Sequence, residues 1–103
     1  MTFGETIADY RKRAGLSQKD LTTRIRKEDG APISPQYLND LERDRRNPPS
    51  QHLLHQLAEA LGISSEYLTF LAGELPEDLR RTSYEPARVE AAFRAFRREL
   101  KGD

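Results

Sequence analysis

Cysteine and tryptophan are absent from this chain of 103 residues, and methionine occurs only once. Without cysteine, neither a disulfide framework nor a cysteine-ligated metal site can form. No apolar run approaches the roughly 18 residues of a membrane-spanning helix. The first residues also lack the basic start and apolar core of a secretory signal. We therefore expect one small domain with a modest core, located in the cytoplasm and without a membrane partner.

The sequence also lacks the side-chain combinations of an enzyme active site. The two histidines, His52 and His55, fall with Glu59 on the polar side of one expected helix. The chain offers no convincing further ligands to complete a metal site. No serine stands at a nucleophile elbow, and there is no cysteine nucleophile. We interpret the histidines as part of a solvated helix face, and we expect no catalysis, no metal and no cofactor.

Net charge is missing as well, since 17 basic residues balance 17 acidic ones. The distribution is uneven, however. Residues 1–50 carry ten basic and eight acidic residues, residues 51–79 carry five acidic residues and no basic one, and residues 80–103 carry seven basic and four acidic residues. Contact with phosphate requires a local basic stripe rather than a basic total. The charge pattern therefore leaves a nucleic-acid partner open.

Helix signals fill the chain, and no alternation typical of strands occurs. Hydroxyl residues suited to helix N-caps precede five apolar-periodic segments, at Thr2, Ser17, Ser34, Ser50 and Ser64. Glycines suited to helix ends follow three of these segments, at Gly15, Gly62 and Gly73. A sixth segment, from Pro86 to about Lys101, is helical and amphipathic. We predict an all-α fold of five helices with an additional C-terminal helix.

The third of these segments has the pattern of a DNA recognition helix. Pro35 suits the first helical position after the Ser34 cap, and Leu38 and Leu41 share one face. Two leucines cannot stabilise so short a helix alone, so other helices must present it. Its remaining faces are polar, and a basic segment follows before Pro48 and Pro49 stop the helix.

The sequence SQKDL at residues 17–21, followed by SPQYLNDLER at residues 34–43, resembles the helix-turn-helix of the lambda-repressor-like (Xre) family of transcription factors. The later NP and LAEALG segments fit the same family, and the resemblance covers roughly residues 3–72. It implies a five-helix lambda-repressor-like DNA-binding domain over residues 1–73. It also implies double-stranded DNA as a partner and a homodimer on a palindromic operator, with half-sites about one helical turn apart.

The chain departs from the family between the second and third helices, where seven residues, 26–32, stand in place of a short turn. We expect the second helix to continue for one more turn and Asp29-Gly30 to reverse the chain. Pro32 should hold Ala31 extended, and Ile33 should return to the core before the Ser34 cap.

Side chains for DNA contact are expected on and after the third helix. Gln36 is our first choice for a base edge, because glutamine can bond adenine in bidentate fashion; Asn39 or Asp40 is the next. For the DNA backbone we expect Tyr37, Arg43, Arg45, Arg46 and Asn47. The resemblance adds Gln18 as a backbone contact. It also implies a partly buried ion pair between Arg11 and Glu42 that joins the first and third helices.

The last helix, residues 86–101, follows a linker with a short turn at residues 74–85. It carries an apolar stripe of Val89, Phe93, Phe96 and Leu100. The stripe must be covered by the protein's own body, through Phe70, Leu75 and Leu79, by a second protomer or by another protein. We expect it to contribute to a homodimer interface.

The sequence thus predicts a sequence-specific DNA-binding transcriptional regulator, a repressor that binds its operator as a dimer. The alternative is an antitoxin or protein-interaction module that uses its last helix to bind a protein partner and also binds DNA.

Overall fold

Each of the first five helices begins where the sequence supplies an oxygen for the helix's free N–H groups. The computed structural model describes residues 1–102, and this range contains seven helices and no strand. The helices are α1 Phe3–Arg13, α2 Gln18–Thr22, α3 Pro35–Glu42, α4 Gln51–Leu61, α5 Ser65–Leu71, α6 Glu77–Arg80 and α7 Pro86–Lys101. The prediction of an all-α fold is confirmed. No helix in this range is long and apolar enough to cross a membrane.

Hydroxyl caps start α1 to α5 at the five positions expected from the sequence. In α1 and α2 the cap is reciprocal: Thr2 pairs with Glu5, and Ser17 pairs with Asp20. Each such cap typically contributes about 1 kcal/mol. Ser17 donates its backbone N–H to the Asp20 carboxylate, and this bond lowers the pKa of Asp20 below its ordinary value. The caps therefore fix where each short helix begins.

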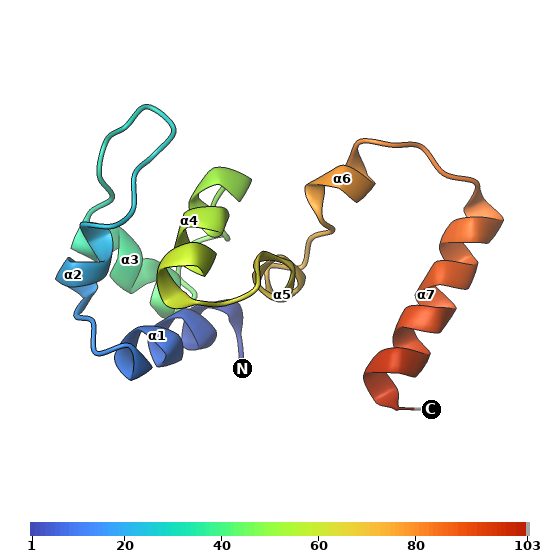
Figure 1. The fold of residues 1–103 in the computed structure, drawn as a ribbon, viewed down its shortest axis with the longest axis horizontal. Coiled ribbons are helices and arrows are strands. Elements are labelled where there is room, and N and C mark those ends of the chain that lie inside the picture. Colours follow the sequence, from blue (N-terminus) through green and yellow to red (C-terminus); the bar gives the residue numbers. More distant parts are fainter. Residues whose placement is uncertain (103) are drawn as a thin grey trace.

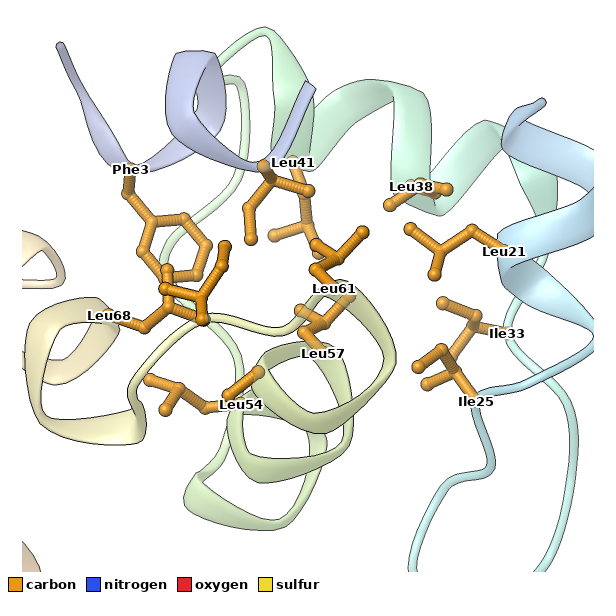
Figure 2. Close-up of a cluster of buried hydrophobic side chains, with 13 residues drawn as sticks. Phe3, Leu21, Ile25, Ile33, Leu38, Leu41, Leu54, Leu57, Leu61 and Leu68 are labelled. Atoms are coloured by element: carbon orange, nitrogen blue, oxygen red, sulfur yellow. The ribbon is translucent and has the colours of Figure 1, made fainter. Parts of the chain in front are cut away.

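One apolar core joins α1 to α5 (Figure 2). Its largest fully buried apolar side chains are Ile7, Leu21, Ile25, Leu38, Leu41, Leu54, Leu57 and Leu68. The two leucines of α3 are both among them, so the recognition helix is held by the other helices, as its length requires. Figure 2 shows Leu38 and Leu41 pointing from α3 toward the side chains of α2, α4 and α5.

Helix α1 crosses α3 at very short range, and Gly4 makes the approach possible. A Cβ atom at Gly4 would stand 2.6 Å from the carbonyl oxygen of Glu42 and would also meet the carbonyl of Leu41. The missing side chain at Gly4 therefore lets the start of α1 lie directly against the end of α3.

The expected extension of the second helix is wrong. Helix α2 ends at Thr22, and the hydroxyls of Thr22 and Thr23 bond back to carbonyls three residues earlier. One further turn has the tighter i→i−3 pattern, after which Ile25 drops into the core. The four-residue spacing of Leu21 and Ile25 is typical of a helix, but a 3₁₀-like turn after Thr22 buries the Ile25 side chain as well.

The inserted segment instead forms a small hairpin (Figure 1). Arg26 and Pro32 pair as an isolated antiparallel bridge. Gly30 closes the turn with a φ of +87°, a conformation that favours glycine, and Asp29 accepts the backbone N–H of Ala31. The predicted reversal at Asp29-Gly30 is confirmed, and Ile33 is buried as expected.

Helices α6 and α7 extend away from this core. Figure 1 shows α7 at the opposite end of the molecule from α2 and the hairpin, joined to α5 through α6 and an extended linker. No residue of α6 or α7 is buried. One aromatic contact joins α7 to α5: the rings of Phe70 and Phe96 pack edge to face with their centroids 6.0 Å apart.

The close α1–α3 crossing gives a first prediction. Gly4→Ala should lower the free energy of unfolding by about 1–3 kcal/mol, because the added methyl group overpacks two backbone carbonyls. Lys12→Ala, an exposed change on the same helix, should stay within about 0.5 kcal/mol of the parent. Denaturant unfolding followed by circular dichroism measures both, and equal stability of the two variants would contradict the crossing.

Candidate nucleic-acid interface

The polar faces of α3 are held outward by its buried leucines. Ser34 caps the helix and accepts the N–H of Tyr37 at 3.0 Å, and Pro35 occupies the first turn. Gln36 is exposed, whereas Asn39 and Asp40 are partly covered. The helix therefore presents a short row of amide and carboxylate groups, of the kind that reads base edges in a major groove.

A buried ion pair fixes α3 against α1. The Arg11 Nε atom lies 2.6 Å from Glu42 Oε2, and Arg11 Nη2 lies 2.9 Å from Glu42 Oε1. Both residues are 8% exposed. The third guanidinium nitrogen donates to the carbonyl of Leu16 at 2.9 Å, which ties in the turn before α2. The hydrogen bond to Glu42 raises the pKa of Arg11 above its ordinary value.

Gln18 extends this network from α2 to α3. Its Nε2 atom donates to Glu42 Oε1 at 3.0 Å and to Asn39 Oδ1 at 3.2 Å. Two side chains expected at DNA, Gln18 and Asn39, are thus bonded to each other. The structure gives the Gln18 amide a role in orienting α3, which sequence reasoning missed.

A second cluster forms around Asp40. Gln36 Nε2 donates to Asp40 Oδ1 at 3.0 Å, and Arg46 Nε lies 3.7 Å from Asp40 Oδ2. The Arg46 guanidinium also stands over the Tyr37 ring, 4.9 Å from its centroid. Partial burial raises the pKa of Tyr37 above its ordinary value, opposed by the nearby Arg46 charge. Four of the expected contact residues therefore lie together on one surface.

The loop after α3 exposes Arg43, Arg45 and Asn47 beside this cluster. Asp44 adopts the left-handed conformation with a φ of +57°, which aspartate tolerates better than most residues. Its carboxylate accepts the N–H of Gly4 at 2.9 Å and the hydroxyl of Thr2. The negative charge of Asp44 is thus placed at the positive end of α1 rather than left free in the basic loop.

The hairpin is anchored to α4 by Gln56 and by His52, and the sequence analysis assigned His52 to a solvated helix face. Gln56 accepts the N–H of Arg26 at 2.7 Å and donates back to the Arg26 carbonyl. His52 Nε2 lies 2.9 Å from the same carbonyl. The spacing of His52 and Gln56 reveals a shared helix face, but no local signal identifies a backbone partner so far away along the chain.

His55 bonds to Ser65 at 2.9 Å and takes no part in a metal cluster. Among residues 1–102, no three histidine or acidic side chains are grouped so that they could hold a metal ion.

A second surface lies at the other end of the molecule. The stripe residues of α7 are 37% to 60% exposed, from Val89 to Leu100. Between α7 and the α5–α6 segment runs an apolar groove of about 770 Å³, lined in part by Phe70, Leu79 and Phe93. The docking residues expected from the sequence therefore do border α7, but they leave it largely uncovered.

Comparison with known proteins places these features in context. A family model described as helix-turn-helix matches residues 7–68. The "Uncharacterized HTH-type transcriptional regulator y4dJ" of Sinorhizobium fredii (strain NBRC 101917 / NGR234) is 38% identical over 73 residues, which cover 71% of this chain and 86% of that protein.

Two solved structures are also similar. SinR, described as the master regulator for biofilm formation and solved in complex with DNA, is 28% identical with a TM-score of 0.53, over 65% of this chain and 97% of that one. A SinR–SinI complex contains a chain 25% identical with a TM-score of 0.53, over 97% of this chain and 92% of that one.

The buried ion pair gives a second prediction. Glu42→Gln should lower the free energy of unfolding by about 3–5 kcal/mol, because it leaves the Arg11 charge buried without its counterion. Asp9→Asn is the matched control, since it breaks the more exposed Asp9–Arg13 pair of 2.9 Å on α1, the helix that carries Arg11. That loss should stay below about 1 kcal/mol. Thermal and denaturant unfolding measure both, and similar losses in the two variants would contradict a buried pair.

Proposed function

The chain belongs to the lambda-repressor-like (Xre) helix-turn-helix family of DNA-binding transcriptional regulators, which are not enzymes, and we propose that it is a repressor that binds a palindromic operator as a dimer. The observation that carries the proposal is the surface of α3, where amide and carboxylate side chains lie beside an arginine-rich loop. Occupation of the operator would exclude other proteins from the same duplex. The protein would act in the cytoplasm, where bacterial regulators of this family meet DNA.

We assign base reading to Gln36 first, and then to Asn39 and Asp40. Gln36 is the most exposed of the three and lies in the first turn of α3, the end of a recognition helix that meets base edges. Its amide can bond adenine through one donor and one acceptor. Asparagine can read adenine in the same way, and aspartate can accept from the amino group of cytosine.

We assign phosphate contact to the loop after α3. Three side chains of this loop are exposed and make no hydrogen bond or ion pair with the residues that the structure describes: Arg43, Arg45 and Asn47. Arg46 can reach phosphate when it leaves Asp40, and Tyr37 lies beside it. Gln18 lies in the first turn of α2, where backbone N–H groups can bond a phosphate. This contact is compatible with the bonds that the Gln18 side chain makes to α3.

These assignments give a third prediction. Arg46→Ala should weaken binding to the selected duplex and reduce the slope of log K against log salt on that duplex by roughly one unit. Gln36→Ala should cost about 1–3 kcal/mol at the preferred site and relax one base position. Arg98→Ala, on the outer face of α7, is the control and should change neither quantity. Fluorescence anisotropy with selected and shuffled duplexes measures all three.

Equal losses on selected and shuffled DNA for Gln36→Ala would remove it as a reader. An unchanged salt slope for Arg46→Ala would remove that residue as a phosphate contact.

The α7 surface supports the dimer. Fully burying one large apolar side chain is worth about 1.5–3 kcal/mol, and the stripe of α7 remains 37% to 60% exposed in the single chain. The groove between α7 and α5 is bordered by Glu66 and Glu74 on one side and by Arg88 on the other. A second copy would bring α7 against this groove with complementary charges at its rim.

The position of α7 is compatible with DNA binding by both copies. Figure 1 places α7 far from α2 and the hairpin that leads into α3. A partner bound along α7 would therefore leave both recognition helices free. Two-fold symmetry of such a dimer matches a palindromic operator.

The dimer gives a fourth prediction. Phe93→Arg should shift the protein toward monomer and weaken binding to a palindrome more than to a half-site, because it places a charge in the apolar stripe. Ala91→Arg adds the same charge on the opposite face of α7 and should leave the dimer intact. Analytical ultracentrifugation and half-site titrations test both, and a Phe93→Arg protein as dimeric as its control would overturn the interface.

A protein partner at α7 is the second candidate. A chain of the SinR–SinI complex matches this one over 97% of its length, which takes in nearly all of α7. In that case α7 would bind a different protein, as in an antitoxin that also binds DNA. A toxin gene directly beside this one would favour this function. A monomeric wild-type protein that binds that toxin, and loses it on Phe93→Arg, would establish it.

A further inference from the structure

The Asp40 carboxylate contacts two of the side chains to which the proposed function assigns DNA contact. Asp40 Oδ1 accepts the Gln36 amide at 3.0 Å, and Asp40 Oδ2 faces the Arg46 guanidinium at 3.7 Å. The Asp40 side chain is only 19% exposed, against 54% for Arg46. Arg46 is held from its other side by the Tyr37 ring at 4.9 Å. Without DNA, Gln36 is therefore hydrogen-bonded to Asp40, and Arg46 is ion-paired with it.

These bonds contribute little to folding. A half-exposed ion pair adds little net stability because solvent screens it, and an i,i+4 amide–carboxylate bond on a helix surface adds less than a buried contact does. The backbone role of Asp40, whose carbonyl accepts the N–H of Arg45 at 2.8 Å, does not involve the carboxylate. The carboxylate can therefore be changed without disturbing α3, and its position needs another explanation.

The same bonds matter greatly for DNA. Arg46 cannot engage a phosphate fully while it faces Asp40, and a free carboxylate beside phosphates is repelled by them. The carboxylate needs a donor in place of the two it gives up. Base amino groups are the donors that a major groove offers, and aspartate fits the N4 amino group of cytosine.

We propose that Asp40 is a specificity-determining residue that restrains Gln36 and Arg46 on DNA of the wrong sequence and releases them where a cytosine amino group takes its carboxylate. The inference rests on the proposed DNA-binding function. It adds that discrimination comes from a penalty on wrong sequences as well as from contacts to the right one.

The experiment compares the full-length protein with Asp40→Asn, which keeps the shape of the side chain and removes its charge. Glu59→Gln removes the same charge from the exposed side of α4 and serves as the control. The probes are a duplex selected by the wild-type protein from a random pool and a shuffled duplex of equal composition. Anisotropy at several salt concentrations gives affinities and salt slopes, and circular dichroism checks folding.

Asp40→Asn should bind the shuffled duplex about tenfold more tightly, with a salt slope steeper by roughly one unit as Arg46 gains a phosphate. Affinity for the selected duplex should change much less, so the ratio between the two should fall. Reselection with this variant should lose a cytosine preference at one position per half-site. The Glu59→Gln control should match the wild type throughout.

An unchanged ratio and slope in Asp40→Asn, with the wild type still selecting a duplex, would overturn the role of Asp40 alone. A ratio that falls because affinity for the selected duplex drops, with no gain on shuffled DNA, would overturn the restraint and leave Asp40 as an ordinary base reader. A wild-type protein that selects no duplex would overturn the proposed function itself.

Discussion

The bond between Arg11 and Glu42 is the interaction on which the DNA-facing part of this protein depends. It joins α1 to the end of α3, while the remaining donor of Arg11 secures the turn at Leu16 and Gln18 brings in α2. Burying both charges offsets most of what their attraction returns, so the pair adds little net stability. Its value is geometric. A planar guanidinium and a carboxylate bonded at two points permit one orientation of α3, whereas leucine packing alone would tolerate several.

The contact surface on α3 is prepared by the same means at smaller scale. Asn39 is hydrogen-bonded to Gln18, Gln36 is hydrogen-bonded to Asp40, and Arg46 is ion-paired with Asp40, so these side chains are restrained in the protein alone. Ordering a long side chain at an interface costs about 0.5–1.5 kcal/mol. Bonds made in advance lower that cost, but each must be exchanged for one that is at least as good. In the proposed function, preorganisation and selectivity would therefore arise from the same contacts.

Much of this arrangement could be predicted from the sequence, because its causes are local. Ser34 before Pro35 fixes the start of α3, and the tolerance of aspartate for positive φ accounts for Asp44. The motif of residues 17–21 and 34–43 led to the family. The end of α2 could not be predicted, because a 3₁₀-like turn and a helix bury Ile25 equally well. The bonds from Gln56 to Arg26 and from Asp44 to Gly4 join residues 30 and 40 positions apart, and no periodicity encodes such pairs.

The C-terminal helix follows a different rule from the rest of the fold. The first five helices are short, individually capped and completed by a shared core, whereas α7 has sixteen residues and no buried one. An isolated helix of that length is marginal in water, so packing of its apolar face must supply the missing stability. The Phe70–Phe96 contact supplies one edge-to-face pair, worth about 0.5–1.5 kcal/mol beyond the area it buries. That amount is small beside what the whole stripe would gain if it were covered. In the proposed dimer, association would cover this stripe and complete the packing of α7. Because α7 lies at the opposite end of the molecule from α2 and the hairpin, such association would strengthen binding to paired sites without altering how either site is read.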